Sequence, residues 1–148
     1  MKRLVILDLD NTLIYGSYDK DLPAKMLFQY SKHLIIYERP FAREFIQKCQ
    51  KTGDVVVYTT AIRDYAEKIC QHLNLKPIEL FSREDCLIKD GMYSKSVPNY
   101  LLDTYNDITI IDDWPEIWDD KSKNKCRIIV VPEYGGNAAD DELLKIEV

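Results

Sequence analysis

Four aspartates are the residues of this sequence best placed to do chemistry together. Asp8 and Asp10 follow the apolar run Leu4–Leu7, and Asp112 and Asp113 follow a second apolar run. Side chains two positions apart on an extended chain point the same way, so Asp8 and Asp10 are expected to face one site. Carboxylates held that close repel each other and stay ionised only when a cation or a donor lies nearby.

All four acids enter one crevice if the two apolar runs are neighbouring strands. Such a set implies a bound divalent metal, and ligation by oxygen atoms alone favours Mg²⁺. The alternative is that acids simply terminate strands, as polar residues often do. That alternative explains one pair of acids more readily than it explains both pairs.

A threonine and a lysine are candidate partners for a phosphoryl group. Thr59 directly follows the apolar run Val55–Tyr58, where its hydroxyl could hold a phosphoryl oxygen, although threonine is also common in turns. Lys95 follows an Asp-Gly turn, and its ammonium could neutralise a phosphate as a point charge. A lone lysine is otherwise an ordinary solvated surface residue.

The elements that must position these residues alternate between strands and helices. Five strands are predicted at Leu4–Leu7, Val55–Tyr58, Ile78–Phe81, Ile108–Ile111 and Arg127–Val131. Helices are predicted over Pro40–Lys51, Ile62–Leu73, Pro98–Leu102 and Asp140–Ile146. This alternation indicates an α/β fold with a parallel sheet and helices on both faces, in which ligands bind at the carboxyl ends of the strands.

Two hairpins are predicted as small additions to this sheet. Their strands are Met26–Tyr30 with Leu34–Tyr37, and Cys86–Ile88 with Met92–Tyr93. A short helix over Ala24–Lys32 is the alternative for the first of these strands. The polar stretch Gly16–Asp21 is expected to be a loop.

Composition places limits on the function. The chain of 148 residues, with 46% hydrophobic residues, is expected to be one domain spanning residues 1–148. A net charge of −5 argues against broad binding to nucleic acid or to an anionic membrane. The apolar runs are too short to span a bilayer, and the first residues lack the pattern of a secretory signal. A cytoplasmic location is therefore expected, or a nuclear one in a eukaryote.

The cysteines and large aromatic residues are expected to be structural. Cys49, Cys70, Cys86 and Cys126 show no C-x-x-C spacing, so reduced and mostly buried thiols are favoured over zinc or disulfides. Core positions are expected for Trp114, Trp118 and Tyr134, with exposed contacts as the alternative.

The motifs together resemble those of the haloacid dehalogenase superfamily of phosphotransferases. The Asp8-x-Asp10-x-Thr12 element resembles its first motif, while Thr59, Lys95 and the pair Asp112-Asp113 match the second, third and fourth. The finer resemblance is to the NLI-interacting-factor-like branch, which includes phosphatases of the RNA polymerase II C-terminal domain. It is carried by the stretches Ile36–Pro40, Val57–Ala61, Arg83–Cys86 and Ile110–Pro115.

This resemblance implies a fold, a mechanism and a set of site residues. The sheet is expected to be Rossmann-like with strand order 5-4-1-2-3, without a large cap domain. Asp8 would be the nucleophile and Asp10 the general acid and base, with Thr59 and Lys95 stabilising charge on the transferring group. Mg²⁺ would be held by Asp8, the main-chain carbonyl of Asp10 and Asp113, with Asp112 in support. Substrate binding is assigned to Thr12, Thr60 and Arg39.

The resemblance favours a phosphatase of phosphoproteins, with two alternatives. An acid at Asp10 favours a phosphatase over a dehalogenase, and an open site suits a phosphoprotein carrying phosphoserine, phosphothreonine or phosphotyrosine. A phosphatase of small molecules or polynucleotide ends is the alternative, and an inactive phosphopeptide-binding module is a third. Two departures from the branch put the substrate in doubt: Asn11 in place of a glutamate, and a short stretch from Gly16 to Arg39.

Overall fold

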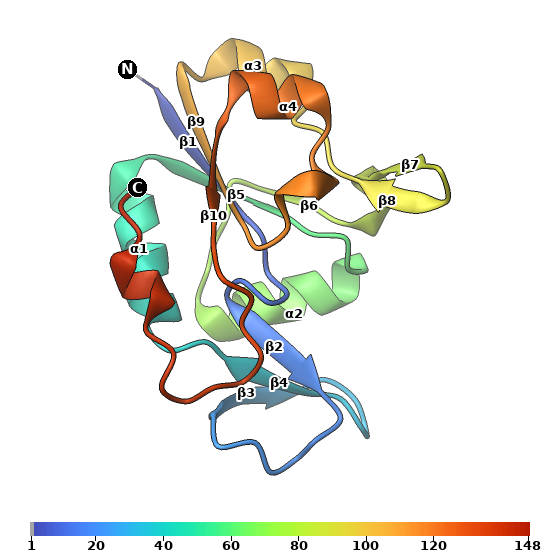
Figure 1. The fold of residues 1–148 in the computed structure, drawn as a ribbon, viewed down its shortest axis with the longest axis vertical. Coiled ribbons are helices and arrows are strands. Elements are labelled where there is room, and N and C mark those ends of the chain that lie inside the picture. The colour runs from blue at the N-terminus through green and yellow to red at the C-terminus, as the bar shows by residue number, and fades with distance from the viewer. Residues whose placement is uncertain (1) are drawn as a thin grey trace.

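A five-stranded parallel sheet forms the centre of the computed structural model, which describes residues 2–148 (Figure 1). In spatial order its strands are β10 (Arg127–Val130), β9 (Asp107–Asp112), β1 (Arg3–Leu7), β5 (Asp54–Tyr58) and β6 (Glu79–Phe81). All neighbouring pairs are parallel. The predicted order 5-4-1-2-3 is confirmed.

The register of the sheet brings the ends of its central strands together. Leu7, the last residue of β1, pairs with Val57 on one side and with Ile111 on the other. The residues that follow these three positions therefore emerge side by side at one edge of the sheet. Strand β1 is central because Leu4–Leu7 is apolar on both faces and fully buried.

Helices cover both faces of the sheet, as predicted. On one face α1 (Ala42–Thr52) and α2 (Arg63–Leu73) share a core with the inner residues of β1 and β5. On the other face α3 (Asn99–Thr104) packs through Leu101 into a second core, and α4 (Asp120–Lys125) contacts β10. The sequence does not predict helix α4, because its six residues carry no apolar stripe.

Two small antiparallel sheets lie at the edges of the molecule (Figure 1). One has the order β2-β4-β3, from β2 (Ile14–Ser17), β4 (Ile35–Glu38) and β3 (Lys25–Gln29). The other is the hairpin of β7 (Leu87–Lys89) and β8 (Met92–Ser94). Both predicted hairpins are confirmed, so the alternative helix over Ala24–Lys32 is wrong. The loop expected to begin at Gly16 begins later, because Gly16 and Ser17 belong to strand β2 and are held extended by pairing with β4.

Three further expectations are decided by tertiary contacts. The predicted helix Asp140–Ile146 is only a 3₁₀ turn over Glu142–Lys145. Trp118 and Tyr134 lie in the core as expected, but Trp114 is 44% exposed, which corrects its placement there. The four cysteines are free thiols, two of them buried and two half-buried.

No helix between residues 2 and 148 has the length and hydrophobicity needed to cross a membrane.

Candidate active site

The predicted site residues meet at the carboxyl ends of the central strands. Asp8 follows β1, Thr59 follows β5, and Asp112 is the last residue of β9. Backbone hydrogen bonds extend the sheet by one step at two of these points, from Asp8 N to Ile111 O (3.0 Å) and from Thr59 N to Phe81 O (2.9 Å). This arrangement follows from the sheet register, because parallel strands end at the same edge.

Three carboxylates form a tight cluster at this edge. Asp8, Asp112 and Asp113 each offer an oxygen, and the three oxygens lie within 4.8 Å of one another. Asp8 and Asp112 are buried and Asp113 is half-buried. Burial raises the pKa of all three carboxyl groups, and the negative charges of their neighbours raise it further. Such a group of acids needs cations to remain ionised.

Lys95 supplies one such cation from the chain itself. Its Nζ lies 3.0 Å from Asp8 Oδ1 and 2.9 Å from Asp112 Oδ2, and the side chain is almost fully buried. Burial disfavours the charged ammonium, but the two carboxylates outweigh this effect and hold the pKa of Lys95 above its usual range. The ammonium also lies 5.3 Å from the centre of the Trp118 ring, at the range of a cation–π contact.

The loop after β1 turns Asp10 toward the same space. Leu9 is fully buried, and Asn11 takes a left-handed conformation with φ of 64°. The Tyr65 hydroxyl donates a hydrogen bond of 2.7 Å to Asp10 Oδ1. Burial raises the pKa of the Asp10 carboxyl to about 6, although the bond from Tyr65 opposes this shift. Tyr65 was expected in an apolar helix stripe and belongs, with Ala66, to the residues that carry the family resemblance, but no role in the site was predicted for its hydroxyl.

Two residues assigned to substrate binding have other partners. The Thr12 hydroxyl lies 2.8 Å from Asp8 Oδ2 and 3.2 Å from Asp113 Oδ1, so it positions both carboxylates by hydrogen bonding. Arg39 is fully buried and forms an ion pair of 2.8 Å with Asp140. Its guanidinium also donates to the carbonyl of Thr12 at 3.0 Å. These positions correct the expectation that Thr12 and Arg39 contact substrate.

Thr60, the third of these residues, does line a pocket beside Asp10. The pocket has a volume of about 420 Å³ and lies between α2 and the three-stranded sheet. Its walls include Thr60, Asp10, Tyr30, Ile62, Tyr65 and Arg83. Ile62 is 46% exposed, so the pocket combines apolar surface with one guanidinium. Ile62 and Arg83 were not among the predicted site residues. Ile62 is close to Thr60 in the sequence, whereas Arg83 is brought there only by the fold, where its Nε donates 2.9 Å to the carbonyl of Thr60.

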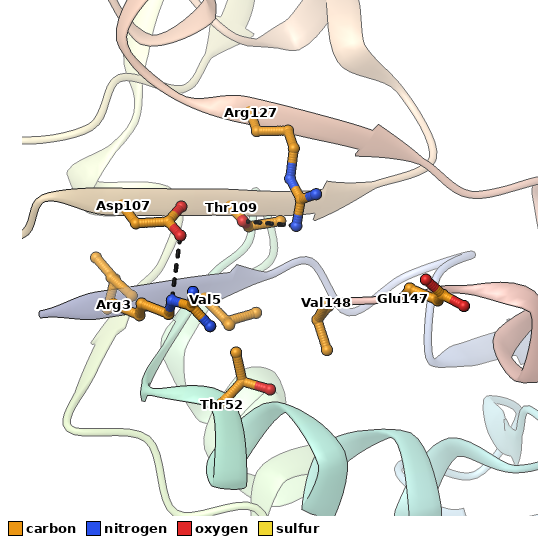
Figure 2. Close-up of a pocket in the computed structure, with 9 residues that line it drawn as sticks. Arg3, Val5, Thr52, Asp107, Thr109, Arg127, Glu147 and Val148 are labelled. Carbon is orange, nitrogen blue, oxygen red and sulfur yellow. Dashed lines mark hydrogen bonds and ion pairs between the residues drawn. The ribbon is translucent and has the colours of Figure 1, made fainter. Parts of the chain in front are cut away.

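A second hollow, of about 440 Å³, lies at the amino-terminal ends of β1 and β9 (Figure 2). It contains none of the clustered acids. Its two arginines already have partners: Arg3 forms an ion pair of 3.3 Å with Asp107, and Arg127 donates to the Thr109 hydroxyl at 3.3 Å (Figure 2). The hollow is therefore separate from the chemistry of the site.

The chemistry of the carboxylate cluster suits a hard divalent cation such as Mg²⁺. All its donors are carboxylate oxygens, and the three oxygens lie within 4.8 Å of one another. Asp112 is the least available of the three, because Oδ1 accepts from Trp114 N and Oδ2 accepts from Lys95 and Trp118 Nε1. Asp8 and Asp113 are better placed to offer free lone pairs.

Solved structures resemble the chain in fold. Fcp1, described as an essential RNA polymerase II CTD phosphatase, matches with a TM-score of 0.66 and 20% identity over 95% of this chain and 44% of that one. Fission yeast Fcp1-R271A bound to beryllium fluoride matches with a TM-score of 0.63, 20% identity, and coverage of 97% and 48%. The chain therefore shares the fold of these Fcp1 structures.

Sequence comparison narrows this class. The family model for NLI interacting factor-like phosphatases matches residues 3–148, so the chain belongs to that family. Similar proteins are CTD small phosphatase-like protein 1 of Caenorhabditis elegans and phosphatase PSR1 of Saccharomyces cerevisiae. Each is 26% identical over 98% of this chain. The chain spans 30% and 35% of their lengths.

Proposed function

We propose that the chain is a Mg²⁺-dependent phosphatase that hydrolyses a phosphomonoester on a phosphoprotein through an aspartyl-phosphate on Asp8. One observation carries this proposal. The carboxylates of Asp8, Asp112 and Asp113 lie within 4.8 Å of one another at the end of the central strand, with Lys95 bonded to two of them. This arrangement provides a nucleophile and positive charge in the same buried place.

In the first step, an Asp8 carboxylate oxygen attacks phosphorus, and the bond from phosphorus to the leaving oxygen breaks. The carboxyl group of Asp10 protonates that oxygen as it leaves. Tyr65 orients Asp10 for this transfer through its hydrogen bond of 2.7 Å. Lys95 and Thr59 stabilise the negative charge on the transferring phosphoryl oxygens.

In the second step, Asp10 takes a proton from water, and the water oxygen attacks phosphorus. The bond from phosphorus to Asp8 breaks, which releases phosphate and restores both carboxyl groups. Mg²⁺ would be held by Asp8, Asp113 and the main-chain carbonyl of Asp10. Asp112 would hold Lys95 in place through its hydrogen bond to Nζ. When bound, Mg²⁺ neutralises charge on the phosphoryl oxygens and aligns them for attack.

The surroundings of the site support a polypeptide substrate. The pocket of about 420 Å³ beside Asp10 is open, and the described residues place no large cap over it. Its exposed Ile62 and the guanidinium of Arg83 could bind the residue next to a phosphorylated side chain. Several relatives are named for phosphatases of the RNA polymerase II C-terminal domain, a polypeptide.

The reaction is tested by hydrolysis of p-nitrophenyl phosphate. Protein stripped of metal with EDTA is expected to be inactive and to recover with Mg²⁺. Asp8→Asn is expected to lower kcat by at least about 1000-fold. Asp103→Asn removes an exposed carboxylate elsewhere and is the matched control. Full activity of Asp8→Asn would reject the nucleophile, and no turnover by folded wild-type protein with Mg²⁺ would reject the enzyme.

The substrate class is tested by a parallel screen. Phosphopeptides, sugar phosphates and 3′-phosphorylated oligonucleotides are compared by kcat/KM under one set of conditions. The highest values are expected for phosphopeptides, because only they can fill the pocket beside Asp10. A strong preference for sugar phosphates or oligonucleotide ends would overturn the phosphoprotein assignment and leave the phosphatase chemistry standing.

A further inference from the structure

A groove of about 310 Å³ lies beside the β7–β8 hairpin and shares no lining residue with the pocket beside Asp10. One wall is the β7–β8 hairpin, with Met92 and Ser94, and the other is the segment from Trp114 to Lys123. None of the residues proposed for catalysis or for metal binding lines this groove. Its surface therefore needs a separate explanation.

Large apolar side chains in this groove face solvent. Met92 is 58% exposed and Trp114 is 44% exposed. Among the described residues the hydrogen bonds of Trp114 are made by its backbone, whose N–H donates 3.0 Å to Asp112 Oδ1, so part of the exposed indole is available to contact a ligand. An exposed tryptophan ring beside a flexible methionine suits the aliphatic stem and cationic head of a lysine or arginine.

The charge of the groove is negative. It is lined by four acids, Asp90, Glu116, Asp119 and Asp120, against the two lysines Lys89 and Lys123. Glu116 and Asp120 are exposed and form no ion pair with any residue from 2 to 148. Two unpaired carboxylates beside a tryptophan complement a basic ligand and repel an acidic one.

The groove is continuous with the candidate active site along the backbone. Ser94 precedes Lys95, and Trp114 follows Asp113, so each wall begins about 3.8 Å of backbone from a site residue. Backbone hydrogen bonds from Lys95 N to Ile117 O (2.8 Å) and from Asp119 N to Lys95 O (3.0 Å) join the two walls. Both walls of the groove are therefore anchored at residues of the candidate active site.

We infer that this groove binds a basic segment of the phosphopolypeptide substrate, a few residues away from the phosphorylated side chain. The inference rests on the proposed function. The phosphate lies against Lys95, and a lysine or arginine of the same chain lies on Trp114 between Glu116 and Asp120. The enzyme then selects substrates in which basic residues lie near the phosphosite, which small phosphomonoesters cannot imitate.

The test compares phosphopeptides that share one phosphoserine core. Two lysines, or two alanines in their place, stand two to five residues before or after the phosphoserine. For one of these placements, wild-type protein is expected to show a kcat/KM about fivefold higher with lysine than with alanine, as two exposed ion pairs would give. The ratio is expected to fall as salt increases.

Variants show which residues of the groove produce the preference for lysine over alanine. Glu116→Gln with Asp120→Asn is expected to reduce the lysine-to-alanine ratio to about one, and Trp114→Ala to reduce it in part. Asp103→Asn with Glu133→Gln removes the same charge at exposed positions elsewhere and should keep the ratio. All variants should hydrolyse p-nitrophenyl phosphate at the wild-type rate, which shows that they are folded and active.

The outcomes separate this inference from the proposed function. Equal kcat/KM for lysine and alanine peptides in both placements, with p-nitrophenyl phosphate turnover intact, overturns the inference that the groove binds basic residues. The proposed phosphatase function then still stands. A ratio that survives in the Glu116 and Asp120 variant also overturns it, as does sedimentation showing a dimer that these substitutions dissociate. Absence of any turnover by wild-type protein rejects both.

Discussion

The acids of the site differ in what surrounds each of them. Asp112 accepts from Lys95, Trp118 and a backbone N–H, whereas Asp113 is half-buried and, among the side chains of residues 2–148, its carboxylate accepts from the Thr12 hydroxyl at 3.2 Å. Two adjacent residues of one type therefore have different surroundings. Asp112 holds Lys95, and Asp113 keeps lone pairs for the cation of the proposed mechanism.

This difference predicts unequal responses to Mg²⁺. About 10 mM Mg²⁺ is expected to raise the Tm of the wild-type protein by about 5 °C, because only the folded state holds the site. Asp113→Asn should abolish this rise. Asp112→Asn should lower the Tm without metal, since Lys95 loses a partner, yet keep most of the rise. Thermal unfolding with EDTA or Mg²⁺ measures both effects, and loss of the rise only in Asp112→Asn would reverse the assignment.

Tyr65 is predicted to affect turnover more than folding. Tyr65→Phe removes the hydroxyl that bonds Asp10 and should lower kcat about tenfold with KM within about twofold. Tyr105→Phe is the control, because it deletes a hydroxyl bonded at 2.7 Å to Asp54 at the far end of the sheet. Steady-state kinetics with p-nitrophenyl phosphate decide the matter. Unchanged kcat in Tyr65→Phe would remove it from the mechanism.

Among the elements, the loop after β1 depends on a distant segment. Arg39, just beyond β4, bonds the carbonyl of Thr12 on that loop, the carbonyl of Pro132 and the carboxylate of Asp140. Tyr134 N donates 2.7 Å to the carbonyl of Asn11, which supports its left-handed turn. The C-terminal segment thus holds the loop on which Asp8 and Asp10 stand.

Loss of this connection should be costly to stability. Arg39→Met leaves Asp140 and the carbonyls of Thr12 and Pro132 without their donor and is expected to lower the free energy of unfolding by about 3–5 kcal/mol. Arg3→Met breaks an exposed ion pair with Asp107 and should change it by less than about 1 kcal/mol. Denaturation in urea measures both variants. Similar small losses would show that the buried arginine contributes little.

The regular elements were predictable where the apolar pattern was strong. All five strands of the main sheet and the two long helices followed from short apolar runs and one amphipathic stripe. Helix α1 begins at Ala42, two residues later than expected, because Phe41 takes a left-handed conformation with φ of 68°. Helix α4 and strand β2 depend on capping and on partner strands, which local patterns do not reveal.

At the scale of the whole molecule, the two cores determine which side chains are reactive. Cys49 and Cys70 lie in the core under α1 and α2, and burial raises the pKa of each thiol to about 12. Cys86 and Cys126 are half-buried at the edge of the second core. The thiols share one chemistry in the sequence and differ only through their positions in the fold.

Alkylation should separate these two pairs. At pH 8.5 the Cys49 and Cys70 thiols of the folded protein remain protonated, since this pH lies well below their raised pKa values, and iodoacetamide cannot reach them. Cys86 and Cys126 are expected to react slowly, and all four to react fully in guanidinium. Mass spectrometry of labelled peptides over time tests this. Rapid labelling of Cys49 in native protein would contradict the core described here.

The sequence by itself determined the α/β architecture and the convergence of Asp8, Thr59 and the Asp112-Asp113 pair, because these depend on periodicity and on where strands end, while the strand order and the place of Lys95 followed from the resemblance of the motifs to a known superfamily. Only the tertiary structure decided the partners of these residues. It separated Asp112 from Asp113, moved Arg39 and Thr12 from substrate binding to support, and brought Tyr65 and Trp118 to the site. Such contacts join residues far apart in the chain, and no local pattern encodes their distances.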